Sequence, residues 1–118
     1  ASVLQPEASK WFDMLGMKES PYMTFSFKCI GDKHLIPAVI HQDDSCRIQT
    51  VTKKQNKNFY KIIETFYKKT NVPMLLNTSL NLAGDALVET PEDALETFKK
   101  STINYLYFPE EKLLCEKL

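Results

Sequence analysis

Apolar residues recur every three or four positions in three segments of the chain. Over residues 56–70 this spacing predicts an amphipathic helix whose lysines face water, and Asn71 is a natural end for it. A second helix is predicted to begin at Thr90, which can act as a cap, followed by Pro91 in the first turn. The apolar spacing over residues 7–15 predicts a third helix.

Shorter apolar runs predict strands. Residues 22–27 alternate aromatic and small polar side chains, and residues 46–51 alternate in the same way. Residues 36–40 are a β-branched run interrupted by a proline, typical of an edge strand or a strand start. We expect this run and residues 46–51 to form a hairpin. Residues 72–76 predict a strand buried on both faces, and residues 105–108 predict a last strand before an amphipathic tail.

Strands and helices alternate in the second half, which predicts an α/β (α+β) fold with a twisted mixed β-sheet packed with helices. The length of 118 residues fits a single domain over residues 1–118. No repeat, linker or low-complexity stretch interrupts it.

The composition narrows the functional classes. Lys+Arg and Asp+Glu both number 15, so the net charge is zero, which argues against a nucleic-acid-binding protein. No apolar run approaches the roughly 20 residues that cross a membrane, and no leader segment is visible. Three widely spaced cysteines favour a reducing cytoplasm over a disulfide framework. The two histidines have no further ligands at metal-site spacing, which argues against a metal site.

The sharpest chemical feature follows the predicted strand at residues 72–76. Asn77, Thr78, Ser79 and Asn81 place amides and hydroxyls directly after it. In open α/β sheets ligands bind at the carboxyl ends of strands, and neutral donors and acceptors suit a phosphate oxygen or a carbamoyl amide. In an extended backbone Asn77, Ser79 and Asn81 would share one face. The alternative is a capped turn, because the same residue types hydrogen-bond their own backbone.

Arg47 is the only arginine in the chain and lies in a predicted strand. A planar, bidentate donor at this place suits a phosphate or a carboxylate, and a surface strand residue is the alternative. His41 ends the preceding predicted strand. A symmetric hairpin would pair His41 with Cys46 and leave Arg47 on the opposite face, whereas a one-residue bulge would bring His41 and Arg47 to the same face. From the residues alone, the sequence predicts an α/β domain with an anion site.

Several segments, in chain order, resemble signatures of the carboxy-terminal domain of the NodU/CmcH-type O-carbamoyltransferases. The resemblance covers nearly the whole chain. It runs through residues 20–23, 36–41, 47–51, 55–56, 59–60, 72–81 and 90–95.

This resemblance implies a YrdC-like partial domain. It implies that Ser79 and Asn81, as a Ser-x-Asn element, lie at a site for nucleotide and carbamoyl phosphate, with Thr78 and Asn77 beside them. By the same comparison Arg47 would bind phosphate or the carbamoyl group, and His41 would lie near that pocket. The implied reaction forms a carbamoyl adenylate from carbamoyl phosphate and ATP, with Mg²⁺, and passes the carbamoyl group to an acceptor hydroxyl.

The sequence departs from the family pattern at two places. Leu80 replaces the usual aromatic residue inside the Ser-x-Asn element, and the turn after His41 reads Asp43-Asp44-Ser45 where the family usually has a glycine. The second departure bears on the hairpin geometry.

The resemblance also implies a partner. It predicts an amino-terminal, metal-binding acceptor domain on the same polypeptide, beyond the present 118 residues, so this chain alone is expected to be inactive. Strands missing before Ala1 would leave a sheet edge open, and we expect self-association there. Alternatives are a free-standing YrdC-like nucleotide-binding module and an interaction domain without a ligand.

Overall fold

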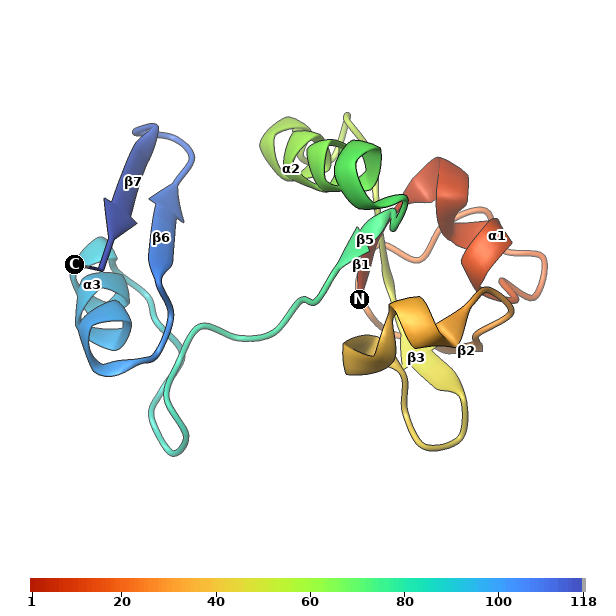
Figure 1. Ribbon diagram of the computed structural model, residues 1–118, viewed down its shortest axis with the longest axis horizontal. Helices are drawn as coiled ribbons and strands as arrows, with labels where there is room; N and C mark the ends of the chain where they lie inside the picture. Colours follow the sequence, from red (N-terminus) through yellow and green to blue (C-terminus); the bar gives the residue numbers. More distant parts are fainter. Residues whose placement is uncertain (118) are drawn as a thin grey trace. The chain divides into compact units, whose positions relative to one another are not determined.

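The computed structural model describes residues 1–117 and consists of two compact units, Ala1–Asn77 and Thr78–Leu118 (Figure 1). Each unit is described by itself. The single-domain organisation over residues 1–118 stays a prediction.

The first unit is built on a three-stranded sheet. Its central strand is β1 (Ser2–Leu4), which pairs in parallel with β4 (Gln49–Val51) and antiparallel with β5 (Met74–Leu75). The sheet is therefore mixed, as predicted. Helices pack against it, which confirms the predicted fold class.

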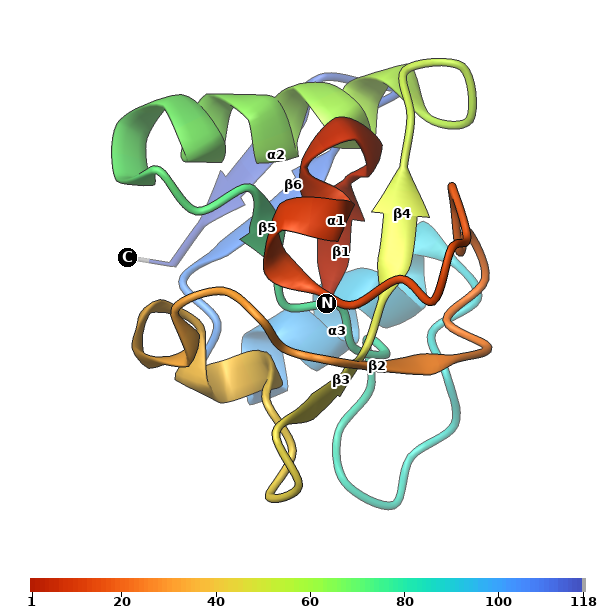
Figure 2. The ribbon, with the colours of Figure 1, turned by 90° about the vertical axis from the view of Figure 1, so that its right-hand side faces the viewer.

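Helix α2 (Lys57–Thr70) lies along one face of this sheet (Figure 2). Its Ile63 is fully buried against Leu4 and Val51. The Asn56 side chain caps the first turn by accepting a hydrogen bond from the Phe59 amide, and Asn71 ends the helix in the left-handed conformation that favours Asn and Gly there. Both ends of this helix agree with the prediction.

A second core lies on the other face of the sheet. The short strands β2 (Ser26–Lys28) and β3 (Ser45–Arg47) pair antiparallel beside helix α1 (Ala8–Trp11). The buried side chains of this core come from segments far apart in the sequence and include Val3, Phe12, Phe27, Ile48 and Met74.

The first helix is shorter than predicted. The apolar spacing over residues 7–15 predicts nine helical residues, but α1 stops at Trp11 after a 3-10 turn over Gln5–Glu7. Phe12 takes an extended conformation, is fully buried and forms a β-bridge with Cys29. Tertiary pairing of Phe12 therefore overrides the helical spacing.

The strand predicted over residues 22–27 is wrong for its first part. Only residues from Ser26 onward form β2. Met23 has a φ of 54°, a left-handed conformation that cannot continue a strand, and Tyr22 is 84% exposed. The aromatic and polar residues that alternate before Ser26 therefore lie in a loop, in which the Tyr22 ring is exposed.

The predicted hairpin between residues 36–40 and 46–51 is also wrong. Residues Lys33–Leu35 and Pro37–Val39 form two 3-10 turns, because Pro37 fixes its own φ and has no amide hydrogen for a ladder. Residues 46–51 divide between β3, which pairs with β2, and β4, which pairs with β1. The strand predicted over residues 72–76 is confirmed only as β5, and Leu76 is 59% exposed.

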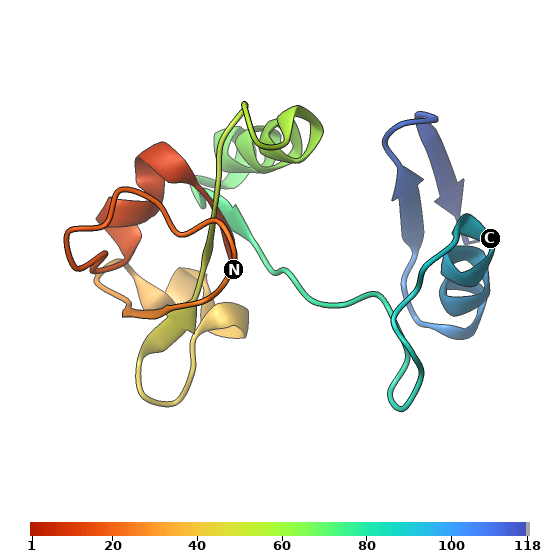
Figure 3. The same cartoon turned by 180° about the vertical axis from the view of Figure 1, so that it is seen from behind.

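The second unit contains helix α3 (Pro91–Lys100) beside an antiparallel hairpin of β6 (Tyr105–Phe108) and β7 (Leu113–Glu116) (Figure 3). Thr90 and Asp93 form a capping box, in which each side chain accepts a hydrogen bond from the other's backbone amide. This helix start and the strand at β6 agree with the prediction. The prediction that β6 is the last strand is wrong, because the predicted tail forms β7 and pairs with β6.

The packing of α2 yields a test of the sheet's first face. Ile63→Ala is expected to lower the free energy of unfolding by about 2–4 kcal/mol, because it leaves a cavity in a fully buried site. Ile62→Ala is the matched control: this neighbouring residue is 43% exposed, so its loss is expected to stay below about 1 kcal/mol. Urea unfolding followed by circular dichroism measures both, and equal losses would contradict the orientation of α2.

Candidate functional site

A pocket of about 150 Å³ lies in the first unit, between the end of β3 and the chain that leaves β5. It is smaller than the roughly 300–1,000 Å³ of ordinary small-molecule sites, so it suits a phosphate-sized group and not a whole nucleotide. We call it the Arg47 pocket. Its lining residues are Ala1, Met23, Ala38, Val39, Ile40, His41, Arg47, Leu76 and Asn77. Three of the six predicted site residues therefore line one pocket.

The turn before β3 brings His41 and Arg47 to this pocket. The His41 amide donates to the Ser45 carbonyl (2.8 Å), and the Asp44 amide donates to the His41 carbonyl (3.0 Å). Asp44 has a φ of 61°, so the loop is a three-residue turn closed by a left-handed residue. His41 thus lies opposite Ser45 and not opposite Cys46. Because side chains alternate along β3, Ser45 and Arg47 share a face, and His41 joins them.

A chain of hydrogen bonds orients the His41 ring. The Ser45 hydroxyl donates to the Asp43 carboxylate (2.6 Å), and His41 Nδ1 lies 3.1 Å from the same hydroxyl. Since that hydroxyl gives its only hydrogen to Asp43, it accepts from His41, which places the ring proton on Nδ1 and leaves Nε2 without it in the neutral ring. The hydroxyl and amide of Ser45 together lower the pKa of Asp43 below its ordinary value, so this carboxylate stays charged.

Arg47 presents an uncommitted cation. Its side chain is exposed, and within the first unit, Ala1–Asn77, the structure gives its guanidinium no hydrogen bond or ion pair. Its backbone is held firmly, because the Arg47 carbonyl accepts from the backbone nitrogen of Ala1 (2.8 Å) beside the β1–β4 ladder. A fixed backbone with a free planar donor is suited to bidentate binding of a phosphate.

Asn77 is tied to the sheet through its amide nitrogen. Asn77 Nδ2 donates to Gln49 Oε1 (3.0 Å) and lies 3.5 Å from the Met23 sulfur. Gln49 Oε1 also accepts from the buried Ser2 hydroxyl (2.8 Å). The polar group of Asn77 is therefore oriented by residues of β1 and β4.

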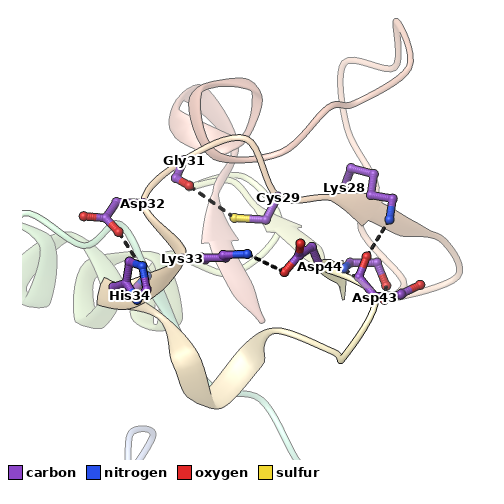
Figure 4. Close-up of polar contacts among 9 residues, drawn as sticks. Lys28, Cys29, Gly31, Asp32, Lys33, His34, Asp43 and Asp44 are labelled. Carbon is purple, nitrogen blue, oxygen red and sulfur yellow. Dashed lines mark hydrogen bonds and ion pairs between the residues drawn. The ribbon is translucent and has the colours of Figure 1, made fainter.

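Two lysines near the turn are already paired (Figure 4). Lys33 forms an ion pair with Asp44 (2.8 Å), and Lys28 donates to the Asp43 carbonyl. The carboxylate of Asp44 raises the pKa of Lys33 by a hydrogen bond and by its charge. Neither lysine lines the Arg47 pocket. Arg47 is accordingly the one lysine or arginine among the residues that line it.

The other three predicted residues, Thr78, Ser79 and Asn81, line a pocket of about 340 Å³ within the second unit. The Ser79 hydroxyl donates to Asn81 Oδ1 (2.6 Å), and Asn81 Nδ2 donates to the Asp85 carbonyl (3.0 Å). Asn81 thus closes its own turn, and every side chain that lines this pocket is uncharged. That Arg47 and the Ser79–Asn81 pair form one anion site stays a prediction.

Sequence reasoning missed the supporting residues. Asp43 and Ser45 were assigned only to a turn, and Gln49 only to a strand. The sequence does contain a signal for this turn. Asp43 stands two residues before Ser45, and an Asp side chain commonly accepts a hydrogen bond from the backbone two residues further on. No local signal points to Gln49, because its partners Ser2 and Asn77 are distant in the sequence.

Residues 1–117 contain no group of three or more His, Cys, Asp or Glu residues arranged to hold a metal ion. No helix within them is long and apolar enough to cross a membrane.

The hydrogen-bond chain at His41 predicts a spectroscopic change. Ser45→Ala removes the hydroxyl that accepts from Nδ1, so the proton is expected to redistribute between the two ring nitrogens. Long-range proton–nitrogen NMR reads this as a convergence of the two nitrogen shifts. Ser45→Thr keeps the hydroxyl and is expected to retain the original pattern. Identical spectra for the alanine variant and the unmodified chain would disprove the assignment.

The left-handed Asp44 predicts a difference between two variants. Asp44→Ala and Asp44→Gly both lose the ion pair with Lys33, but only alanine keeps a Cβ at a φ of 61°. The glycine variant is therefore expected to be more stable by about 1 kcal/mol. Thermal and urea unfolding measure the difference, and an alanine variant as stable as the glycine variant would show that the turn has another geometry.

Comparison with known proteins identifies the family of the chain. A family model described as "Carbamoyltransferase C-terminus" matches residues 1–116. Nodulation protein NolO of Bradyrhizobium diazoefficiens is 34% identical over 107 residues, which are 89% of this chain and 20% of that protein. The 3'-hydroxymethylcephem-O-carbamoyltransferase of Amycolatopsis lactamdurans is 33% identical over 75 residues, which are 64% of this chain and 14% of that protein.

The chain spans about one fifth or less of the length of these curated relatives. They are long chains in which the matching region is the carboxy-terminal part, so other domains accompany it. The family model covers nearly the whole sequence. The chain therefore belongs to the carbamoyltransferase C-terminus family.

Proposed function

We propose that this chain supplies the carbamoyl phosphate site of an ATP-dependent O-carbamoyltransferase. In the reaction water cleaves the phosphate from carbamoyl phosphate, the carbamate oxygen displaces pyrophosphate from ATP, and carbamoyl adenylate forms. The carbamoyl group then passes to an acceptor hydroxyl and releases AMP. The observation that carries the proposal is the meeting of Arg47, His41 and Asn77 on one small pocket in a member of this family.

The chemistry of the Arg47 pocket supports an anionic ligand. The guanidinium stays charged throughout the physiological pH range and offers a fork of donors that matches two phosphate oxygens. It requires no change of protonation to hold the departing phosphate. His41 carries its Nδ1 proton toward Ser45, so its Nε2 is free to meet a ligand. Asn77 adds a neutral amide.

Ser79, Asn81 and Thr78 are proposed as further ligands of the nucleotide or of the carbamoyl group, in a YrdC-like arrangement. Their pocket is lined by uncharged groups, which can bind a phosphate ester or a sugar hydroxyl by hydrogen bonds. Leu80 stands where relatives usually have an aromatic residue, and a half-buried leucine supplies apolar surface without a ring to stack on a base.

ATP, carbamoyl phosphate and Mg²⁺ are proposed as the substrates and the accompanying ion. The proposed partner is an amino-terminal, metal-binding acceptor domain, as expected for a chain that spans so little of its relatives. The chain alone is proposed to bind ligand without turnover. Self-association through a sheet edge would have to use β5, because the outward Thr50 amide of β4 already donates to the Ser20 carbonyl (2.8 Å).

The proposal predicts that carbamoyl phosphate binds the chain and that Arg47→Ala weakens this binding by about tenfold to a hundredfold, the value of a charged hydrogen-bond pair. Isothermal titration calorimetry at low salt measures both. Arg47→Lys keeps the charge and loses the fork, so an intermediate affinity is expected. Lys61→Ala removes an exposed cation of α2 and is expected to change nothing.

Two other results would assign a different function. Binding of ATP without carbamoyl phosphate would indicate a free-standing nucleotide-binding module. Absence of binding to either compound would indicate an interaction domain. Affinity for carbamoyl phosphate that is the same in Arg47→Ala would remove the Arg47 pocket from the mechanism.

A further inference from the structure

The carboxamide of Gln49 joins strands β1 and β4 of the central sheet to the segment that follows β5. Ser2 of β1 lies opposite Gln49 of β4 on one side and opposite Leu75 of β5 on the other. Asn77 follows Leu75 by two residues. Gln49 Oε1 accepts one hydrogen bond from the Ser2 hydroxyl and one from Asn77 Nδ2, at 2.8 and 3.0 Å. Both lone pairs of this oxygen are therefore occupied.

This arrangement determines which end of the Asn77 side chain is free. Its Nδ2 contacts Gln49 Oε1 and the Met23 sulfur, both of which are acceptors. If the Asn77 carboxamide alone were reversed, its oxygen would face Gln49 Oε1 and the hydrogen bond would be lost. If the Gln49 carboxamide were reversed as well, the buried Ser2 hydroxyl would lose the acceptor of its hydrogen. Asn77 Oδ1 consequently remains as an acceptor, and within the first unit, Ala1–Asn77, the structure gives it no donor. Asn77 also lines the Arg47 pocket.

We infer that Asn77 Oδ1 accepts a hydrogen bond from the N–H₂ group of the carbamoyl moiety, and that Gln49 is a positioning residue that holds Asn77 in this orientation. The inference rests on the proposed function and names the residue that would make the site select carbamoyl phosphate over other acyl phosphates. Arg47 provides the attraction for the phosphate, which every acyl phosphate carries. Asn77 provides the acceptor that only an acyl phosphate with an N–H donor can satisfy.

Carbamoyl phosphate and acetyl phosphate are a matched pair for this question. They have nearly the same shape and carry the same phosphate, but the carbamoyl nitrogen donates hydrogen bonds and the acetyl methyl group cannot. A site that bonds a substrate N–H rejects the analogue that lacks it, because its own polar group is then left unpaired. The ratio of the two affinities therefore measures the effect of the hydrogen bond to Asn77 Oδ1.

The test is calorimetric titration of the 118-residue chain with carbamoyl phosphate, acetyl phosphate and inorganic phosphate. Carbamoyl phosphate is expected to bind about tenfold more tightly than acetyl phosphate, the value of one hydrogen bond in a partly desolvated pocket. Inorganic phosphate controls for hydrolysis of the other two. Arg47→Ala is expected to weaken all three together.

Asn77→Leu replaces the carboxamide with an apolar group of similar shape. It is expected to bring the two affinities together, because it weakens the binding of carbamoyl phosphate and removes the unpaired acceptor that disfavours acetyl phosphate. Asn58→Leu, on the exposed surface of α2, is the control and is expected to keep the discrimination.

Two variants test the positioning role of Gln49. Gln49→Leu removes the acceptor that orients Asn77, so most of the discrimination is expected to disappear. Gln49→Glu keeps an acceptor oxygen. It is expected to retain the ratio of the two affinities while its added charge weakens both, a result that a purely structural role for Gln49 would not produce.

The outcomes separate the two proposals. Equal binding of carbamoyl and acetyl phosphate by the unmodified chain would overturn the role of Asn77 and leave the proposed function in place. Absence of any binding of carbamoyl phosphate would overturn the proposed function and this inference with it. Discrimination that survives Asn77→Leu would assign selectivity to another residue.

Discussion

The pairing of the central strand β1 with both of its neighbours organises the first unit. Three residues of β1 pair with β4 on one side, and two of them also pair with β5 on the other. The same pairing aligns Gln49 and Leu75 on either side of Ser2, and Asn77 lies two residues beyond the end of β5. Without β1, the Gln49 carboxamide would lose the Ser2 hydroxyl and the backbone of Arg47 would lose a partner. The architecture and the proposed site thus depend on the same short strand.

The turn at residues 41–45 contains a left-handed residue that is not glycine. A glycine commonly serves where the backbone must be left-handed, and Asp is among the few other residues that tolerate this conformation. Here Asp44 takes it, and its carboxylate pairs with Lys33. The exposed ion pair offsets part of the conformational cost. The turn therefore keeps His41 and Arg47 on one face without a glycine.

The parts of the fold that could be predicted from the sequence are those determined by local interactions. The ends of α2 and the start of α3 follow from their capping residues, which act within one helical turn. The helix predicted over residues 7–15 failed because Phe12 gains more by pairing with Cys29 than by extending α1. The hairpin failed because β3 and β4 find partners in β2 and β1, which are distant in the sequence.

The candidate site was predictable to the same extent. Arg47, His41 and Asn77 could be identified as candidate site residues from their type and position, and the structure brings these three to one pocket. The residues that orient them could not be identified from the sequence. Ser45 acts on His41 through a turn whose register depends on a left-handed backbone, and Gln49 acts on Asn77 across the sheet. Such contacts depend on which distant strands pair, and no local signal in the sequence identifies those partners.

The choice of a single arginine among fourteen lysines has a physical explanation in the first unit. Lys28 and Lys33, the lysines that contact the turn, are held there by the Asp43 carbonyl and the Asp44 carboxylate (Figure 4). A lysine in the place of Arg47 would be a compact, flexible point charge without the planar fork of donors. The guanidinium is broader and planar, and in the structure it is bound to neither acceptor. Pairing of the neighbouring lysines within the turn therefore leaves Arg47 as the cation that remains available to a phosphate at this pocket.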